Sequence, residues 1–198
     1  MQYQESSFSQ FFYSIPIVTR VLFFTTLSFS VVGVFYPDLF YLCYFDQEQI
    51  ASGQIWRLFT PFFCQQLGFS FLIHLFMLYN FSKELEEEYF NKDTTDYIFY
   101  LLFNFCLLNT FSVFVGPLHY YFISLFVYTA SRANPNSIVS LSFGITLRRM
   151  YLPWALVVLN FILGAPILPQ ILIILIAHFY YFLRHVIPVH YPTLPRLV

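Results

Sequence analysis

Residues 54–63 read Gln-Ile-Trp-Arg-Leu-Phe-Thr-Pro-Phe-Phe, an apolar and aromatic run that contains one guanidinium group and lies between two strongly hydrophobic stretches. A charge inside lipid costs several kcal/mol unless it reaches the interface or finds a partner. Trp56 followed by Arg57 therefore indicates a loop that lies at the membrane interface or is partly inserted. The alternative is a plain surface anchor, in which Trp56 belongs to the aromatic belt and Arg57 reaches lipid headgroups.

The whole chain has the composition of a polytopic membrane protein. Its 198 residues are 59% hydrophobic and 10% charged, with a mean hydropathy of +0.67, which excludes an ordinary soluble domain. Alternation of apolar and polar residues at a period of two is not seen, so helices and not a barrel must satisfy the backbone in lipid. Six stretches approach the roughly 20 apolar residues that span a bilayer: Ile17–Tyr36, Phe69–Phe81 (continuing toward Tyr89), Tyr97–Val115, Leu118–Ala130, Tyr151–Leu163 and Ile167–Leu183.

The basic residues predict the orientation of these spans. With six spans, the N-terminus, the second and fourth loops and the C-terminus share one side of the membrane. Eight of the nine basic residues fall on that side: Arg20, Lys83, Lys92, Arg132, Arg148, Arg149, Arg184 and Arg196. The positive-inside rule therefore places both termini in the cytosol and Arg57 on the far side. A net charge of −1 without a basic run argues against nucleic acid as a partner.

The chain divides into a cytosolic or interfacial segment 1–14, a membrane domain 15–188 and a short cytosolic tail 189–198. The first segment has no basic region or small-residue cleavage site, so we expect no removable signal peptide. It is rich in tyrosine and phenylalanine and could lie along the membrane surface as an amphipathic segment.

Two of the expected spans are short. Leu118–Ala130 and Tyr151–Leu163 have 13 residues each, which covers roughly 20 Å of a hydrocarbon core about 30 Å thick. Taken literally, the bilayer must thin around them. Alternatively, the fifth helix begins near Leu147, and Arg148 and Arg149 extend to the cytosolic headgroups.

Several polar side chains fall within or close to the spans, where an unpaired polar group is expensive. They are His74, Asn104, Asn109, Ser124, Asn160 and His178. We expect them to line a hydrated cavity, chiefly His74, Ser124 and His178, or to form hydrogen bonds between helices. The charged run Ser82–Asp96 is typical of a solvated helix end, and the alternative is a docking site for a cytosolic partner.

Catalysis is disfavoured by the residues themselves. Ser124 and His178 are the candidate nucleophile and base of an intramembrane serine protease, but no glycine adjoins Ser124 to open the backbone for an oxyanion site. The histidines and cysteines lack the spacing of metal ligands, so we expect no metal and no cofactor. The three cysteines (Cys43, Cys64 and Cys106) do not make a disulfide framework and are expected to be small core residues.

Seven stretches, taken in order, resemble one family, the derlins, which are inactive relatives of the rhomboid proteases. These stretches are Ile15–Arg20, Gln54–Phe63, His74–Tyr79, Ser82–Glu87, Ser131–Pro135, Tyr151–Trp154 and His178–Leu183. The resemblance covers nearly the whole chain, from about Ile15 to Pro188. It implies an all-α membrane protein with a six-helix, rhomboid-like bundle in the endoplasmic reticulum membrane, working without catalysis in the degradation of misfolded proteins.

The resemblance also assigns residues. The family's Trp-Arg motif of the first lumenal loop maps onto Trp56 and Arg57, and the rhomboid histidine maps onto His178, whereas the serine motif has no counterpart. The Gly-x-x-x-Gly of the derlin sixth helix aligns with Ile173 and Ala177, so glycine is missing at both positions. Two glycines at this spacing would permit close helix packing.

The partners implied are misfolded proteins, a membrane ubiquitin ligase complex and the AAA ATPase valosin-containing protein (Cdc48). No tail motif for the ATPase is visible after Pro188, so its contact is expected to be indirect or to use loops 82–96 and 134–149. A homo-oligomer is left open. We expect the bundle to form a laterally open, partly hydrated cavity in a thinned bilayer; the alternatives are an intramembrane protease and a scaffold for the ligase complex.

Overall fold

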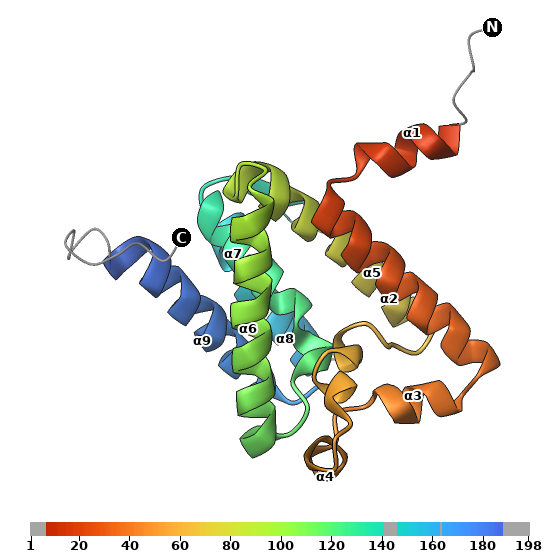
Figure 1. Cartoon of the computed structure of the whole chain (residues 1–198). Helices are drawn as coiled ribbons and strands as arrows, with labels where there is room; N and C mark the ends of the chain where they lie inside the picture. Colours follow the sequence, from red (N-terminus) through yellow and green to blue (C-terminus); the bar gives the residue numbers. More distant parts are fainter. Residues whose placement is uncertain (1–6, 141–145, 163, 188–198) are drawn as a thin grey trace, which may run out of the picture.

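The computed structural model describes residues 7–140, 146–162 and 164–187, and this part of the chain is almost wholly helical (Figure 1). Its one sheet is a short antiparallel hairpin of β1 (Ile138–Ser140) and β2 (Thr146–Arg148), in which Val139 pairs with Leu147. The expected tail 189–198 lies outside the described residues.

Each of the six apolar stretches forms a helix, so the chain is a helical membrane protein as predicted. The helices are α2 (Ile17–Phe35), α5 (Phe69–Glu84), α6 (Thr94–Val115), α7 (Ile123–Ala133), α8 (Leu152–Ile162) and α9 (Ile167–Tyr181). Among the described residues, α2, α6 and α9 with its π-helical extension η7 (Phe182–Val186) are long and apolar enough to cross a membrane. A π-helical turn, η3 (Leu85–Tyr89), prolongs α5 to Tyr89, as expected.

The short spans are shorter than expected. The α-helices α7 and α8 have 11 residues each, which corresponds to about 16 Å. The alternative that the fifth helix begins near Leu147 is correct to within two residues. Leu147 itself pairs in β2, and the 3-10 turn η6 (Arg149–Tyr151) leads directly into α8, so that a helix runs over Arg149–Ile162.

The core lies where α5, α6, α7 and α9 meet, and it combines aliphatic side chains with a cluster of aromatic rings. Helix α7 packs against α5, α8 and α9, and α6 packs against α9. The ring of Tyr100 lies 4.9 Å from that of Tyr180 and 6.2 Å from that of Phe126, measured between centroids. The Tyr100 hydroxyl also reaches Thr129 Oγ1 at 3.0 Å. Buried tyrosines of this kind supply apolar area while their hydroxyl groups remain hydrogen-bonded.

The amino end of α2 is capped from a distance. Proline at position 16 has no side chain that can accept the free amide groups of the first turn. Glu86 of η3 does so instead: Oε1 accepts from Val18 N at 3.0 Å, and Oε2 accepts from Thr19 N at 2.7 Å and Thr19 Oγ1 at 2.8 Å. A carboxylate is the favoured group at a helix amino end. Glu86 is buried, so the solvated-surface interpretation of Ser82–Asp96 is wrong at this residue.

The cap continues as a directed chain of hydroxyl groups. Because Thr19 donates to Glu86, Ser82 must donate to Thr19 and Tyr97 to Ser82, at 2.9 and 2.7 Å. These residues come from α2, α5 and α6, and all are buried. One carboxylate therefore orders contacts among three helices.

Helix α1 (Ser7–Ser14) precedes this junction and points away from the bundle (Figure 1). Arg20 holds its carboxyl end, donating from Nη2 to the carbonyl oxygens of Tyr13 at 3.2 Å and Ile15 at 2.7 Å. Its guanidinium lies 4.6 Å from the centre of the Phe12 ring. A location of this segment at the membrane surface stays a prediction.

We expect Glu86→Gln to destabilise the protein by about 2–4 kcal/mol, because a charged acceptor is lost and an amide N–H₂ must face backbone N–H groups. Thermal unfolding of the full chain in detergent measures the change. Glu87→Gln is the matched control, since Glu87 forms no hydrogen bond found in the described ranges and should shift stability by less than about 0.5 kcal/mol. Equal melting temperatures for the two variants would contradict the capping role.

Candidate functional site

Arg57 lies in the 3-10 helix η1 (Ile55–Leu58) and is only 1% exposed. Its Nη1 donates to the carbonyl oxygens of Tyr41 and Tyr44, each at 2.8 Å, and its Nε donates to Gln54 Oε1 at 2.7 Å. The guanidinium carbon also lies 5.5 Å from the centre of the Tyr41 ring. The charge that the sequence placed at an interface is thus enclosed by its own loop and cannot reach lipid headgroups.

The partners of Arg57 are the free carbonyl groups at the end of a short helix. Helix α3 (Asp38–Cys43) ends just after Tyr41, so the carbonyl groups of its last turn have no partners within the helix. A cation is favoured at such a carboxyl end. No carboxylate forms an ion pair with Arg57 in the part of the chain that the structure describes. Backbone dipoles therefore offset the desolvation of this charge.

The side chains around Arg57 face the other way. Trp56 is 48% exposed, and Ile55 and Phe59 are also exposed. The tight turn of η1 directs the guanidinium inward and leaves these apolar groups outside. An apolar outer face with a satisfied polar interior is the arrangement that a loop needs to enter a membrane interface.

Further short helices fill the loop between α2 and α5. They are α4 (Gln47–Ala51) and the 3-10 turn η2 (Thr60–Phe62). Helix α3 packs closely on α2 because Gly33 has no side chain: a Cβ atom there would lie 2.4 Å from the Phe40 ring. The loop is consequently a packed unit, fixed to α2 at one end.

The same loop is fixed to α6 at its other end. Asn109 of α6 donates from Nδ2 to the carbonyl of Leu58 at 3.0 Å, and its Oδ1 lies 3.1 Å from His119 Nε2. Phe62 is fully buried and stacks on Phe105, with ring centroids 4.0 Å apart and planes 12° from parallel. The expected interhelical hydrogen bonding of Asn109 thus serves to dock the loop.

A cavity of about 500 Å³ lies between this loop and the helices. Its lining is mainly apolar and includes the aromatic rings of Phe40, Phe45 and Phe71, and polar groups of Gln65, Gln66, Ser70 and His119 lie among them. His119 Nδ1 is buried and has no hydrogen-bond partner among the described residues. A buried polar atom of this kind is satisfied by water where there is room and other polar groups are near. The volume of the cavity leaves room for water beside these polar groups.

None of the three polar residues expected to line a cavity is part of this lining. Of the three, His74 on α5 contacts a residue of the lining: its Nε2 lies 2.8 Å from Gln65 Nε2. His178 is exposed on α9, and its Nδ1 lies 2.6 Å from the Tyr128 hydroxyl. Ser124 is half-buried at the start of α7. No hydrogen bond joins Ser124 to His178 in the described structure, so these two residues form no nucleophile–base pair there.

The sequence did not single out Gln65, Gln66, Ser70 and His119. The first three follow directly on the Gln54–Phe63 run, and His119 follows Gly116-Pro117. Their position next to breaks between helices was the available signal, because loops between spans bring polar groups to the ends of a bundle.

Ile173 and Ala177 are both fully buried on α9, which packs against α6, α7 and α8. The bundle therefore accommodates an isoleucine at the first of the two positions that the family resemblance assigned to glycine. A specific role of this pair in close helix approach stays a prediction.

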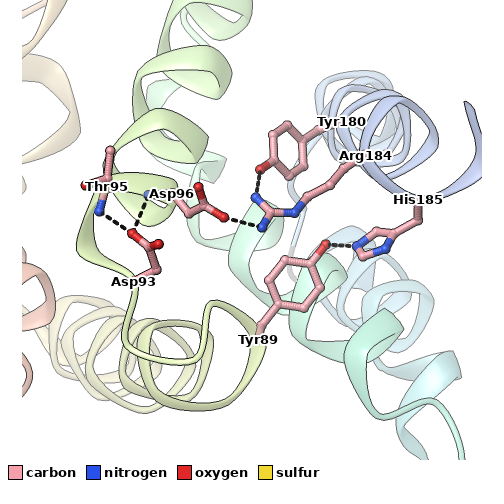
Figure 2. Close-up of polar contacts among 7 residues, drawn as sticks. All are labelled: Tyr89, Asp93, Thr95, Asp96, Tyr180, Arg184 and His185. Carbon is pink, nitrogen blue, oxygen red and sulfur yellow. Dashed lines mark hydrogen bonds and ion pairs between the residues drawn. The ribbon is translucent and has the colours of Figure 1, made fainter. Parts of the chain in front are cut away.

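The opposite end of α6 is closed by an ion pair and a hydrogen-bond cluster. Figure 2 shows Arg184 between Asp96 and Tyr180: Nη2 lies 2.5 Å from Asp96 Oδ2, and Nη1 donates to the Tyr180 hydroxyl at 2.9 Å. Beside it, the Tyr89 hydroxyl lies 2.5 Å from His185 Nε2. A second ion pair, Arg149 with Glu84, joins the end of α5 to η6.

The fold and the loop define a multi-pass helical membrane protein with a buried-arginine loop at one end of its bundle. The sequence matches the model of the Der1-like family over residues 15–195. Derlin-1 of Mus musculus is 32% identical over 191 residues, which cover 90% of this chain and 74% of that protein. Derlin-1 of Arabidopsis thaliana is 34% identical over 187 residues, covering 90% and 69%. The chain belongs to the Der1-like family, which confirms the resemblance to derlins.

The contacts of Arg57 predict a measurable effect on its loop. In Arg57→Ala the carbonyl groups of Tyr41 and Tyr44 lose their donors, so amide hydrogen exchange should accelerate across residues 38–58. Arg57→Lys should give a smaller effect, because lysine keeps the positive charge. Some effect should remain, because one ammonium group cannot reproduce the fork of the guanidinium. Arg148→Ala, which removes an exposed arginine, is the control and should leave the loop unchanged. Equal protection in all variants would show that Arg57 does not hold the loop.

Proposed function

We propose that this protein is a non-catalytic component of endoplasmic-reticulum-associated degradation that helps misfolded proteins to cross back to the cytosol. In this proposal α2 and α5–α9 form a six-span, rhomboid-like bundle in the endoplasmic reticulum membrane, with both termini cytosolic. Membership of the Der1-like family supports the class of function. The excess of basic residues on one side supports the orientation.

The observation that carries the proposal is the cavity behind the Arg57 loop, together with the two 11-residue helices. A polypeptide crossing a membrane must bring peptide groups into lipid, and each unsatisfied group costs several kcal/mol. A cavity with amide, hydroxyl and imidazole groups lowers that cost on the lumenal side. Helices of about 16 Å beside a hydrocarbon core of about 30 Å shorten the rest of the path.

Trp56 and Arg57 act in this proposal by holding the cavity wall in place. Arg57 fixes the loop to the end of α3, and exposed Trp56 sets its depth at the lumenal interface. The charge of Arg57 does not contact the moving chain, because its guanidinium group is enclosed.

The cytosolic partners would be a membrane ubiquitin ligase complex and, indirectly, the AAA ATPase. Loop 82–96 and the described residues 134–140 and 146–149 of the second loop are the surfaces proposed for them. The ion pair of Glu84 with Arg149 connects the two loops, so a partner that moves one loop would also move the other. A homo-oligomer is a further arrangement, and the mass of the protein in detergent would measure it.

Blocking the cavity tests the proposed path. Ser70 lines the cavity and is exposed, so Ser70→Trp should fill it without disturbing the core and should slow turnover of a misfolded lumenal reporter. Ser52→Trp is the matched control, because Ser52 is exposed in the same loop region but lies outside the cavity lining. Unchanged turnover with Ser70→Trp at equal protein level would contradict passage through the cavity and would favour a scaffold.

Removal of the candidate nucleophile Ser124 should have no effect on turnover of the reporter. We expect Ser124→Ala to support normal turnover and the chain to remain unlabelled by serine-directed fluorophosphonate probes, since Ser124 has no base beside it in the described structure. Labelling that disappears in Ser124→Ala would instead establish a protease.

A further inference from the structure

Two cysteine residues line the same cavity. Cys43 is the last residue of α3, and Cys64 follows η2 on the other side of the Arg57 loop. Both are free thiols, with Cys43 buried and Cys64 half-buried. Two thiols that open on one cavity from the two sides of a folded loop are candidates for disulfide partners.

The backbone around this pair is already fixed by one residue. Thr60 Oγ1 donates to the carbonyl of Cys43 at 3.0 Å, and the Thr60 carbonyl accepts from Cys64 N at 3.1 Å. Thr60 therefore links the backbones of both cysteines and keeps them near each other. A disulfide needs such closeness of the two backbones, because its geometry is narrow.

The third cysteine is not part of this arrangement. Cys106 is exposed on α6 and does not line the cavity. Its exposure contradicts the expectation that all three cysteines are core residues.

We propose that Cys43 and Cys64 are a redox-active pair that forms a disulfide by exchange with an external disulfide, such as that of an oxidoreductase or of oxidised glutathione. The inference rests on the proposed function in one respect, which is that this loop faces the lumen. Disulfides form and persist in such an oxidising compartment.

The exchange is balanced in two steps. The Cys64 thiolate, the more accessible of the two, attacks one sulfur of the external disulfide, which releases one thiolate and leaves a mixed disulfide. The Cys43 thiolate then attacks the Cys64 sulfur and displaces the second external thiolate. The two protons lost by the cysteines are taken up by the two released thiolates, so the pair is oxidised by two electrons and the external disulfide is reduced to two thiols.

The environment of Cys64 makes this exchange slow in the closed loop. Burial beside Cys43 raises the pKa of the Cys64 thiol to about 12, so thiolate is scarce at neutral pH. Widening of the cavity would expose the thiol and speed the reaction. Once formed, the bond would close residues 43–64 into a covalent ring that contains Arg57 and would hold the loop against α3.

Peptide mapping of the full chain in permeabilised microsomes tests the pair. After incubation with oxidised glutathione and trapping with N-ethylmaleimide, mass spectrometry should find a Cys43–Cys64 linked peptide that is lost on reduction. Cys106 should be alkylated in every sample. Thr60→Val should slow linkage, because it loses the hydroxyl that holds Cys43, while Ser52→Ala in the same loop should not.

Single variants make the outcome decisive. Cys64→Ser should leave Cys43 unlinked, and Cys106→Ser should leave the linked peptide unchanged. Two unlinked, alkylated cysteines after oxidation of the wild-type chain, or linkage of either one to Cys106, would overturn the proposal. Because the readout is a covalent bond and not turnover, failure here is distinguishable from failure of the proposed degradation function, which the Ser70→Trp experiment measures.

Discussion

The arrangement of the bundle depends on the carboxylate of Glu86, because it holds the amino end of α2 against the end of α5. Three hydrogen bonds from α2 converge on it, and a hydroxyl chain continues from Thr19 to Tyr97 on α6. In a low-dielectric interior such bonds are strong, and an unpaired partner is correspondingly expensive. Helices α2 and α5 also flank the Arg57 loop in sequence. Their pairing therefore fixes the two points from which that loop must start and return.

Arg57 is the electrostatic counterpart of Glu86 at the other end of the bundle. Glu86 supplies an anion to free N–H groups at the start of a helix, and Arg57 supplies a cation to free carbonyl groups at the end of one. Neither charge is paired with an opposite charged side chain in the described ranges. Both are matched by backbone dipoles, which a membrane protein must satisfy internally in any case. Burial of two charges thus completes helix ends that lipid could not solvate.

Hydropathy predicted the six helices well, because the thickness of the bilayer sets the length of an apolar stretch and the lipid requires apolar residues along it. It did not predict α3, α4 and η1, since helices of four to six residues carry no periodic signal. The sequence placed Arg57 in the loop between the first two apolar helices but could not show its partners, which are mostly main-chain carbonyl groups. Within Ser82–Asp96, nothing local marks Glu86 as the carboxylate that turns inward. Its partner, the α2 amino end, is 67 residues away and becomes visible only in three dimensions.

The placement of these charges also limits what the cavity can offer to another polypeptide. Arg57 and Glu86 are both enclosed by their own helix ends, and no Asp, Glu, Lys or Arg of the described residues lines the cavity. Its polar groups come from Gln65, Gln66, Ser70, His119, Tyr44 and Tyr120, together with the thiols of Cys43 and Cys64. Groups of this kind donate and accept hydrogen bonds without selecting for one sign of charge. A misfolded protein presents both signs in no fixed order, and a strongly charged wall would retain one of them. For the proposed passage, weak and unselective contacts suit movement better than tight binding, since a chain that must leave cannot be held firmly.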